Sequence, residues 1–175
     1  MLAGHLQGRV LAMLNHMIKP KVVLEIGIYT GYSALCWAEG LPAHGVIHTA
    51  EINDELESKI RAFIDRSSNG ICIQLHFGNA LEIIPQIEGK LDIVSIDADK
   101  ENYSAYYTQV FDRVVSGGFI IADNVLWSGK IIDYPDNMDC KTRFLDDYSK
   151  KVKEDERVEN VLFPIRDGLM MARKK

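Results

Sequence analysis

Val22-Val-Leu-Glu-Ile-Gly-Ile-Tyr-Thr-Gly-Tyr-Ser33 begins as an apolar, β-branched run and ends in two glycines and a polar turn. A strand that is buried on both faces has this composition, because helices that cover a parallel sheet leave no face for polar side chains. Gly27 and Gly31 follow at the carboxyl end of this strand, where a missing side chain lets a ligand approach the backbone. Open α/β sheets bind nucleotides at this position. Ile28 stands where a dinucleotide-binding turn needs its second glycine, so the pattern favours a nucleoside ligand without phosphate.

Apolar runs alternate with helical patterns on both sides of this stretch. Strands are predicted at 22–27, 46–52, 71–77, 91–97 and 118–123, and helices at 2–18, 31–40, from 53–54 to 69–70, after 80, at 103–115 and at 137–154. Two further strands, 158–165 and 169–173, are joined by Arg166-Asp-Gly168, which is a hairpin signal. The alternation predicts a doubly wound α/β fold with a mostly parallel, seven-stranded sheet, and the antiparallel C-terminal hairpin puts one antiparallel strand at its edge. Residues 1–175 show no repeat or linker, so we expect a single domain.

Composition and charge describe a soluble globular protein. The chain has 175 residues, of which 47% are hydrophobic, and its formal net charge is −5. This acidic balance argues against broad binding to a nucleic-acid backbone. No apolar run approaches the roughly 20 residues that span a bilayer, and the N-terminus lacks a signal-peptide pattern, so we expect a cytoplasmic protein without a membrane partner. Cys36, Cys72 and Cys140 have neither disulfide nor zinc spacing, and the first two are expected to be small buried residues.

Acidic side chains stand at the ends of three predicted strands. They are Glu51, Asp97, and Asp123 with Asn124 beside it. Because the carboxyl ends of parallel strands meet at one edge of a sheet, these side chains are expected to converge above the glycine turn. A carboxylate one strand away from that turn can accept both hydroxyl groups of a ribose, and this is the role predicted for Glu51. The alternative is that Glu51 caps the next helix.

The ends of the fourth and fifth strands offer three oxygen ligands. Carboxylate and amide oxygens favour Mg²⁺ or Ca²⁺, and a partly hydrated ion fits a site with so few protein ligands. We therefore predict a divalent metal on Asp97, Asp123 and Asn124, the alternative being that both aspartates cap helices. Lys100 follows Asp97 by three residues. A divalent cation nearby lowers the pKa of a lysine, so Lys100 is a candidate general base, and a solvated lysine is the alternative.

Aromatic residues flank this predicted metal site. Tyr103, Tyr106 and Tyr107 have helical spacing, which is more typical of a buried helix face than of a substrate pocket. Trp127 lies instead in the loop after the fifth strand, at the functional edge. An aromatic wall for a planar substrate is plausible there.

Six motifs are spread over nearly the whole chain: Glu25-Ile-Gly-Ile-Tyr-Thr-Gly-Tyr-Ser33, Glu51, Gly78-Asn-Ala80, Asp97-Ala-Asp-Lys100, Gly118-Phe-Ile-Ile-Ala-Asp-Asn124 and Pro164-Ile-Arg-Asp-Gly-Leu169. In this order and spacing they resemble the cation-dependent O-methyltransferases, which include catechol and caffeoyl-CoA O-methyltransferases and bacterial relatives. The resemblance implies a class I methyltransferase sheet that binds S-adenosylmethionine (SAM) over the glycine turn. It also implies a homodimer. Relatives carry additional N-terminal helices before the segment that matches Met1 to Leu11, and residues 1–175 lack them.

The resemblance also assigns roles to individual residues. Gly27, Tyr29 and Ser33 would surround the methionine part of the cofactor, and Glu51 would hold its ribose. Asn79 and Ala80 would border the adenine. Asp97 would lie near the amino group of the cofactor and would bind Mg²⁺ together with Asp123 and Asn124, and Lys100 would be the general base.

We therefore expect a Mg²⁺-dependent O-methyltransferase that moves a methyl group from SAM to a hydroxyl of a small catechol-like or phenolic acceptor. Three alternatives remain open. The chain could methylate a hydroxyuridine of tRNA, it could be an NAD-binding oxidoreductase, or it could be a non-catalytic remnant that binds SAM.

Overall fold

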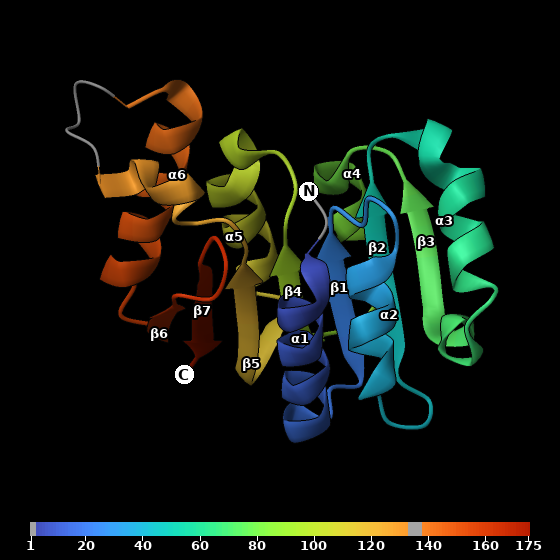
Figure 1. The fold of residues 1–175 in the computed structure, drawn as a ribbon. Coiled ribbons are helices and arrows are strands. Elements are labelled where there is room, and N and C mark those ends of the chain that lie inside the picture. The colour runs from blue at the N-terminus through green and yellow to red at the C-terminus, as the bar shows by residue number, and fades with distance from the viewer. Residues whose placement is uncertain (1–2, 133–137) are drawn as a thin grey trace.

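The computed structural model describes residues 3–132 and 138–175. Within these residues it forms one seven-stranded sheet with the order β3-β2-β1-β4-β5-β7-β6 (Figure 1). The strands are β1 (Val22–Ile26), β2 (Val46–Glu51), β3 (Ile73–Phe77), β4 (Leu91–Ile96), β5 (Val114–Ala122), β6 (Val158–Phe163) and β7 (Leu169–Lys174). β1 to β5 pair in parallel, whereas β7 pairs antiparallel with both β5 and β6. The predicted doubly wound α/β fold is confirmed.

The antiparallel strand lies inside the sheet, not at its edge as predicted. β7 sits between β5 and β6, so β6 forms the edge. Burial gives the reason: the first four residues of β7 are buried, whereas five of the six residues of β6 are exposed. The strand of the hairpin that has a neighbour on each side is thus the more buried one.

Helices cover both faces of the sheet (Figure 1). They are α1 (Gly4–Ile18), α2 (Tyr32–Glu39), α3 (Glu57–Ile64), α4 (Ala80–Ile83), α5 (Tyr103–Phe111) and α6 (Cys140–Glu154), with short 3₁₀ turns at η1 (Asp54–Leu56), η2 (Ser68–Cys72), η3 (Ile84–Gln86), η4 (Lys100–Asn102) and η5 (Trp127–Ile132). α1, α2 and α3 pack on one face, and α4, α5 and α6 pack on the other. No helix in the described part of the chain has the length and apolarity needed to cross a membrane.

Element boundaries differ from the prediction where β-branched or capping residues compete with helix. α5 ends at Phe111, because Val114 already pairs with Leu91 of β4 and β5 starts there. α3 ends before the predicted position, and η2, capped by Ser67, delays β3. α6 begins after Asp139, whose side chain accepts a hydrogen bond from the Thr142 backbone N–H. The predicted start of that helix at 137, and the end of the preceding loop, lie outside the described residues.

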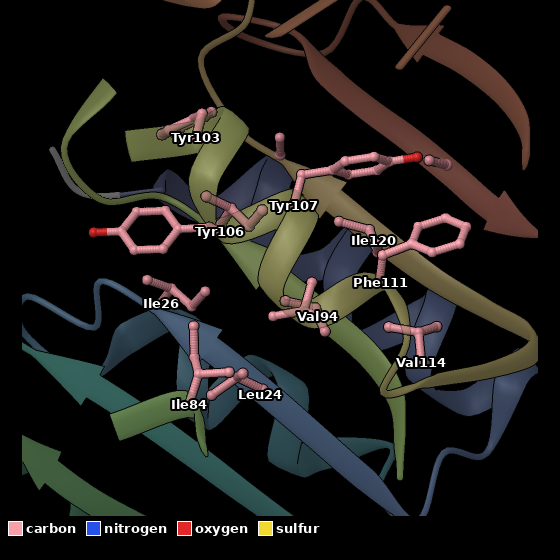
Figure 2. Packing of buried hydrophobic residues seen from close by; sticks show 14 of the residues in the cluster. Leu24, Ile26, Ile84, Val94, Tyr103, Tyr106, Tyr107, Phe111, Val114 and Ile120 are labelled. Carbon is pink, nitrogen blue, oxygen red and sulfur yellow. The ribbon is translucent and has the colours of Figure 1, made fainter. Parts of the chain in front are cut away.

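The core on the α5 side is built from β1, β4, β5 and the aromatic face of α5. Figure 2 shows Tyr107 and Phe111 beside Val94 and Ile120. The three tyrosines of α5 are buried, as their spacing predicted. Cys36 is buried, also as predicted, whereas the prediction for Cys72 was wrong, since it is only half-buried and lies in η2.

Gly27 is needed because the turn after β1 passes close to the end of β4. Its φ is 91°, and a Cβ there would overlap the backbone carbonyl of Asp97. The neighbouring backbones are also hydrogen-bonded, since Asp97 N–H donates to Ile26 O at 2.9 Å. The glycine thus permits the approach that brings Asp97 close to the turn after β1.

Glu25 places a carboxyl group inside the sheet. The residue is 2% exposed, and its Oε2 has no hydrogen-bond partner among the described residues. Burial raises the pKa of Glu25 to about 8; the hydroxyl of Ser33 opposes this, and the carboxylates of Asp97 and Glu51 add to it. Glu25 is therefore protonated at neutral pH.

Substitution of Gly27 by alanine tests the close approach. We expect Gly27→Ala to lower the free energy of unfolding by on the order of 3 kcal/mol, because the methyl group meets both a positive φ and a fixed backbone. Gly89→Ala is the matched control, since φ there is 81° and nothing lies within 4 Å of the added Cβ. It should cost about 1 kcal/mol. Urea unfolding measures both losses, and equal losses would show that backbone strain alone is responsible.

Substitution of Glu25 by glutamine tests the buried proton. An unfolded glutamate ionises near pH 4.3, roughly, whereas native Glu25 keeps its proton up to about pH 8. Between these values the native state binds more protons, so stability falls as pH rises, by roughly 1.4 kcal/mol per pH unit for one proton. Urea unfolding from about pH 5 to 8 should therefore show a shallower decline for Glu25→Gln. Exposed Glu88→Gln should decline like the unmodified protein; equal slopes in all three proteins would exclude a buried proton at Glu25.

Candidate functional site

The polar strand ends converge at one edge of the sheet, as predicted. The hydrogen-bond ladder continues past each strand: Gly27 N–H donates to Ala50 O at 2.9 Å, and Asp123 N–H donates to Ile96 O at 2.9 Å. Glu51, Asp97 and Asp123 are therefore held by the sheet backbone itself. The start of α1 comes over this edge (Figure 1), where Gln7 Nε2 donates to Asp123 Oδ2 at 2.5 Å.

A cavity of about 460 Å³ opens over the ends of β1 and β2. It contains six of the seven residues predicted to bind the cofactor: Gly27, Tyr29, Glu51, Asn79, Ala80 and Asp97. The seventh, Ser33, lies in a small adjoining cavity that shares Gly27, Tyr29 and Asp97 with it. The structure thus brings the whole predicted set together.

Glu51 is held by two backbone N–H groups. Its Oε2 accepts from Tyr29 at 2.9 Å, and its Oε1 accepts from Asn53 at 3.0 Å. Tyr29 has a φ of 53°, which is a strained conformation for a residue with a side chain. Asn53, and not Glu51, caps the following helical turn, because its side chain accepts a hydrogen bond from the Glu55 N–H. Each Glu51 oxygen retains acceptor capacity toward the cavity.

The start of α4 forms one end of this cavity. Asn79 caps this helix, since its Oδ1 accepts from the Leu81 N–H at 3.0 Å. This bond fixes the Asn79 side chain, and the buried Ala80 beside it presents a small apolar surface. Tyr106 also lines this cavity, with its hydroxyl donating to Asp99 Oδ1 at 2.6 Å.

A second cavity of about 440 Å³ lies on the other side of Asp97. Its lining includes Lys100, Asn124, Trp127 and Lys141. Trp127 therefore occupies the position at which the sequence predicted an aromatic wall. Because Asp97 lines both cavities, ligands bound in the two would meet beside this carboxylate. The arrangement suits transfer of a group from one ligand to the other.

Lys100 lies between the predicted metal ligands. Its Nζ donates to Asp97 Oδ1 and to Asn124 Oδ1, both at 3.1 Å, and to the hydroxyl of Tyr103 at 2.5 Å. It also lies 5.8 Å from the centre of the Trp127 ring. The side chain is 9% exposed, so the solvated-lysine alternative is wrong.

Asp123 and Asn124 are buried and do not cap helices. Asp123 Oδ1 accepts from the Asn124 N–H at 2.6 Å, and Asn124 has a φ of 61°. Burial raises the pKa of Asp97 to about 6; Lys100 opposes this, and Asp123 adds to it. Within the described residues, no group of three or more His, Cys, Asp or Glu side chains could hold a metal. The predicted metal ligands are two carboxylates and an amide, and the structure places the Lys100 ammonium between Asp97 and Asn124.

Sequence reasoning gave no role to three residues that the structure places here. Gln7 fixes Asp123, Tyr103 contacts Lys100, and Glu25 shares a small cavity with Ser33, Asp97 and Asp123. For Tyr103 the spacing of three residues from Lys100 was a usable signal, because such pairs meet on one helical turn. Gln7 offered no signal, since its partner is 116 residues away.

Comparison with known proteins agrees with this geometry. The family model described as O-methyltransferase matches residues 1–175. Caffeoyl-CoA O-methyltransferase 5 of Nicotiana tabacum is 34% identical over 179 residues, which cover 96% of this chain and 75% of the relative. An O-methyltransferase structure from Bacillus cereus in complex with SAH has a TM-score of 0.91 and 28% identity, covering 98% of this chain and 82% of that one. The SAH-bound methyltransferase of Podospora anserina has a TM-score of 0.89 and 30% identity, covering 99% of this chain and 80% of that one.

These similarities exclude one of the interpretations that the sequence left open. The NAD-binding oxidoreductase is excluded, because the family match extends over the whole chain and the similar structures are methyltransferases. The chain belongs to the O-methyltransferase family and is a SAM-dependent enzyme of the caffeoyl-CoA O-methyltransferase type.

Proposed function

We propose that the enzyme transfers a methyl group from SAM to a hydroxyl of a small catechol-like or phenolic acceptor, and that a divalent cation, Mg²⁺ by preference, is required. The observation that carries the proposal is the position of Asp97 between two cavities of similar size, with Lys100 and Trp127 in the second. Trp127 suits a planar acceptor, and the plant relative is a caffeoyl-CoA O-methyltransferase.

The cofactor would lie in the cavity over β1 and β2. Glu51 has acceptor capacity for the ribose hydroxyls, and the backbone at Gly27 leaves room for the methionine end. Tyr29 and Ser33 line the adjoining space. Asp97 would face the amino group of SAM from one side and the acceptor from the other.

The cation would be held by Asp97, Asp123 and Asn124. Their hard oxygen donors suit Mg²⁺, which keeps part of its water shell when few protein ligands are present. When bound, the cation would lower the pKa of the acceptor hydroxyl beside it. The protein fixes these ligands tightly, since Asp123 bonds Gln7 and the Asn124 backbone, and Asn124 bonds Lys100.

With the cation bound, which disfavours a second positive charge nearby, Lys100 Nζ would release its ammonium proton to solvent and, as the neutral amine, would take the proton of the acceptor hydroxyl. The acceptor oxygen then forms a bond to the methyl carbon while the bond from that carbon to sulfur breaks, and S-adenosylhomocysteine leaves. The two cavities share Asp97 in their lining, which supports a bound donor and acceptor lying next to each other. Homodimer formation stays a prediction.

Loss of Lys100 tests the role of the base. We expect Lys100→Ala to lower kcat by about 100-fold or more toward the best acceptor, the usual contribution of general base catalysis. Lys150→Ala, on the exposed face of α6, should keep its turnover. The assay uses SAM, Mg²⁺ and a panel of catechols, caffeoyl esters and unmodified tRNA. Unchanged turnover in Lys100→Ala would exclude this role, and full activity in excess chelator would exclude the cation.

The same acceptor panel separates the remaining interpretations. Methylation of tRNA and of no phenolic compound would replace the proposed acceptor class by a hydroxyuridine. Binding of SAM without transfer to any phenolic compound or to tRNA would contradict both of these acceptor classes.

Loss of the Glu51 charge tests the cofactor cavity without an activity assay. Glu51→Gln keeps the side-chain shape but replaces one acceptor oxygen by a donor. We expect the Kd for SAM to rise roughly tenfold, because hydrogen bonds to a charged group contribute about 1.5–3 kcal/mol. Calorimetric titration measures this, with exposed Glu55→Gln as the control. Equal Kd values for Glu51→Gln and the control would show that Glu51 does not contact the ribose.

A further inference from the structure

The charged end of Lys100 occupies an unusual place for a lysine. It donates to three oxygens, and two of these, Asp97 Oδ1 and Asn124 Oδ1, belong to the residues proposed to hold the divalent cation. Both lie at 3.1 Å, and the lysine side chain is nearly buried. The ammonium therefore already sits where a second positive charge would have to enter.

We propose that the Lys100 ammonium is the resident cation of the Asp97–Asn124 pair when no divalent ion is bound, and that a divalent ion must displace it to bind. The inference rests on the proposed function, since it takes Asp97, Asp123 and Asn124 as the cation ligands. It goes further by making Lys100 a competitor for the site.

Charge balance explains why a resident cation is needed. Asp97 and Asp123 come from neighbouring strands and repel each other, and Asp97 is largely buried. Without a cation, the two carboxylates would face each other across a poorly solvated site. Lys100 offsets this repulsion.

Geometry explains why the two cations exclude each other. Mg²⁺ binds oxygen ligands at about 2.1 Å, closer than the Nζ contacts, and it would need Asn124 Oδ1, the one oxygen of that side chain, which already accepts from Lys100. An ammonium and a divalent ion on one carboxylate oxygen would lie within a few ångströms, with strong repulsion at low local dielectric. One of them has to move.

Tyr103 provides the place to which the ammonium can move. Its hydroxyl donates to the Asp123 backbone oxygen at 2.9 Å, so the lone pairs of that hydroxyl remain for Lys100. Tyr103 is fully buried and therefore fixed. The Trp127 ring centre lies 5.8 Å from Nζ, and Trp127 lines the second cavity. Displacement would thus release Lys100 from Asp97 and Asn124 and leave it on Tyr103, facing the acceptor.

Cation affinity in the absence of SAM and acceptor tests this competition. We expect Lys100→Met to bind Mn²⁺ or Mg²⁺ at least tenfold more tightly than the unmodified enzyme by calorimetric titration, roughly the effect of removing one close like charge. Lys141→Met is the matched control, because Lys141 lines the same cavity and makes no hydrogen bond to Asp97 or Asn124 in the described residues. It should change affinity by less than about threefold. The gain in Tm on addition of Mg²⁺ should also be larger for Lys100→Met than for either other protein.

A second neutral variant, Lys100→Gln, keeps the test usable if Lys100→Met does not fold, and it should also bind the cation more tightly. Equal affinities for the position-100 variants and Lys141→Met would overturn the inference. If the unmodified enzyme binds Mg²⁺ and requires it for methyl transfer while the variants bind no more tightly, the inference fails and the proposed function stands. If no protein binds a cation and transfer continues in excess chelator, the proposed cation dependence fails as well.

Discussion

The close approach of the turn after β1 to the end of β4 is the contact on which the site depends. Asp97 N–H donates to Ile26 O, and the absent side chain at Gly27 leaves space for the Asp97 carbonyl. Because both backbones are fixed, the Asp97 carboxylate is held between the two cavities. The same ladder continues to β5 through Asp123 N–H and Ile96 O. The positions of the acids therefore follow from the sheet pairing and not from loop structure.

This dependence explains how much of the molecule could be predicted from its sequence. Apolar runs such as 22–27 and 91–97 are typical of strands in a parallel sheet covered by helices, so the parallel sheet and its shared polar edge followed from the pattern, whereas the order of the strands did not. The position of β7 could not be derived this way, since either strand of a hairpin can pair with β5. The two strands have the same number of apolar residues, and only the tertiary structure shows that β7 is the buried one. The ends of some helices also differ from the prediction by a few residues, because Ser67 and Asp139 cap helices by accepting backbone hydrogen bonds.

Some residues of the candidate site could be identified from the sequence, and others could not. Residues at strand ends could be identified, because the sheet alone brings Glu51, Asp97 and Asp123 to one edge. Residues that reach the site through packing could not: Gln7 meets Asp123 because α1 crosses the strand ends, a tertiary fact with no local pattern. Tyr103 was correctly interpreted as a core residue, yet its hydroxyl also contacts Lys100. Periodicity predicts which face of a helix is buried, but it does not predict the hydrogen-bond partner of the hydroxyl on a buried tyrosine ring.

Asp97 links the two halves of the reaction, and this limits what its substitution can show. The carboxylate borders the cofactor cavity and the second cavity, bonds Lys100 and interacts with Asp123. Any change there would alter cofactor binding, charge balance and acceptor geometry together, and the effects would not add. Glu51 lines the first cavity alone and Lys100 the second alone, so their substitutions act first on different cavities. Lys100 also bonds Asp97, and Ala98, Asp99 and Glu101 line both cavities, so the two cavities are coupled through the segment 97–101 and not through one carboxylate.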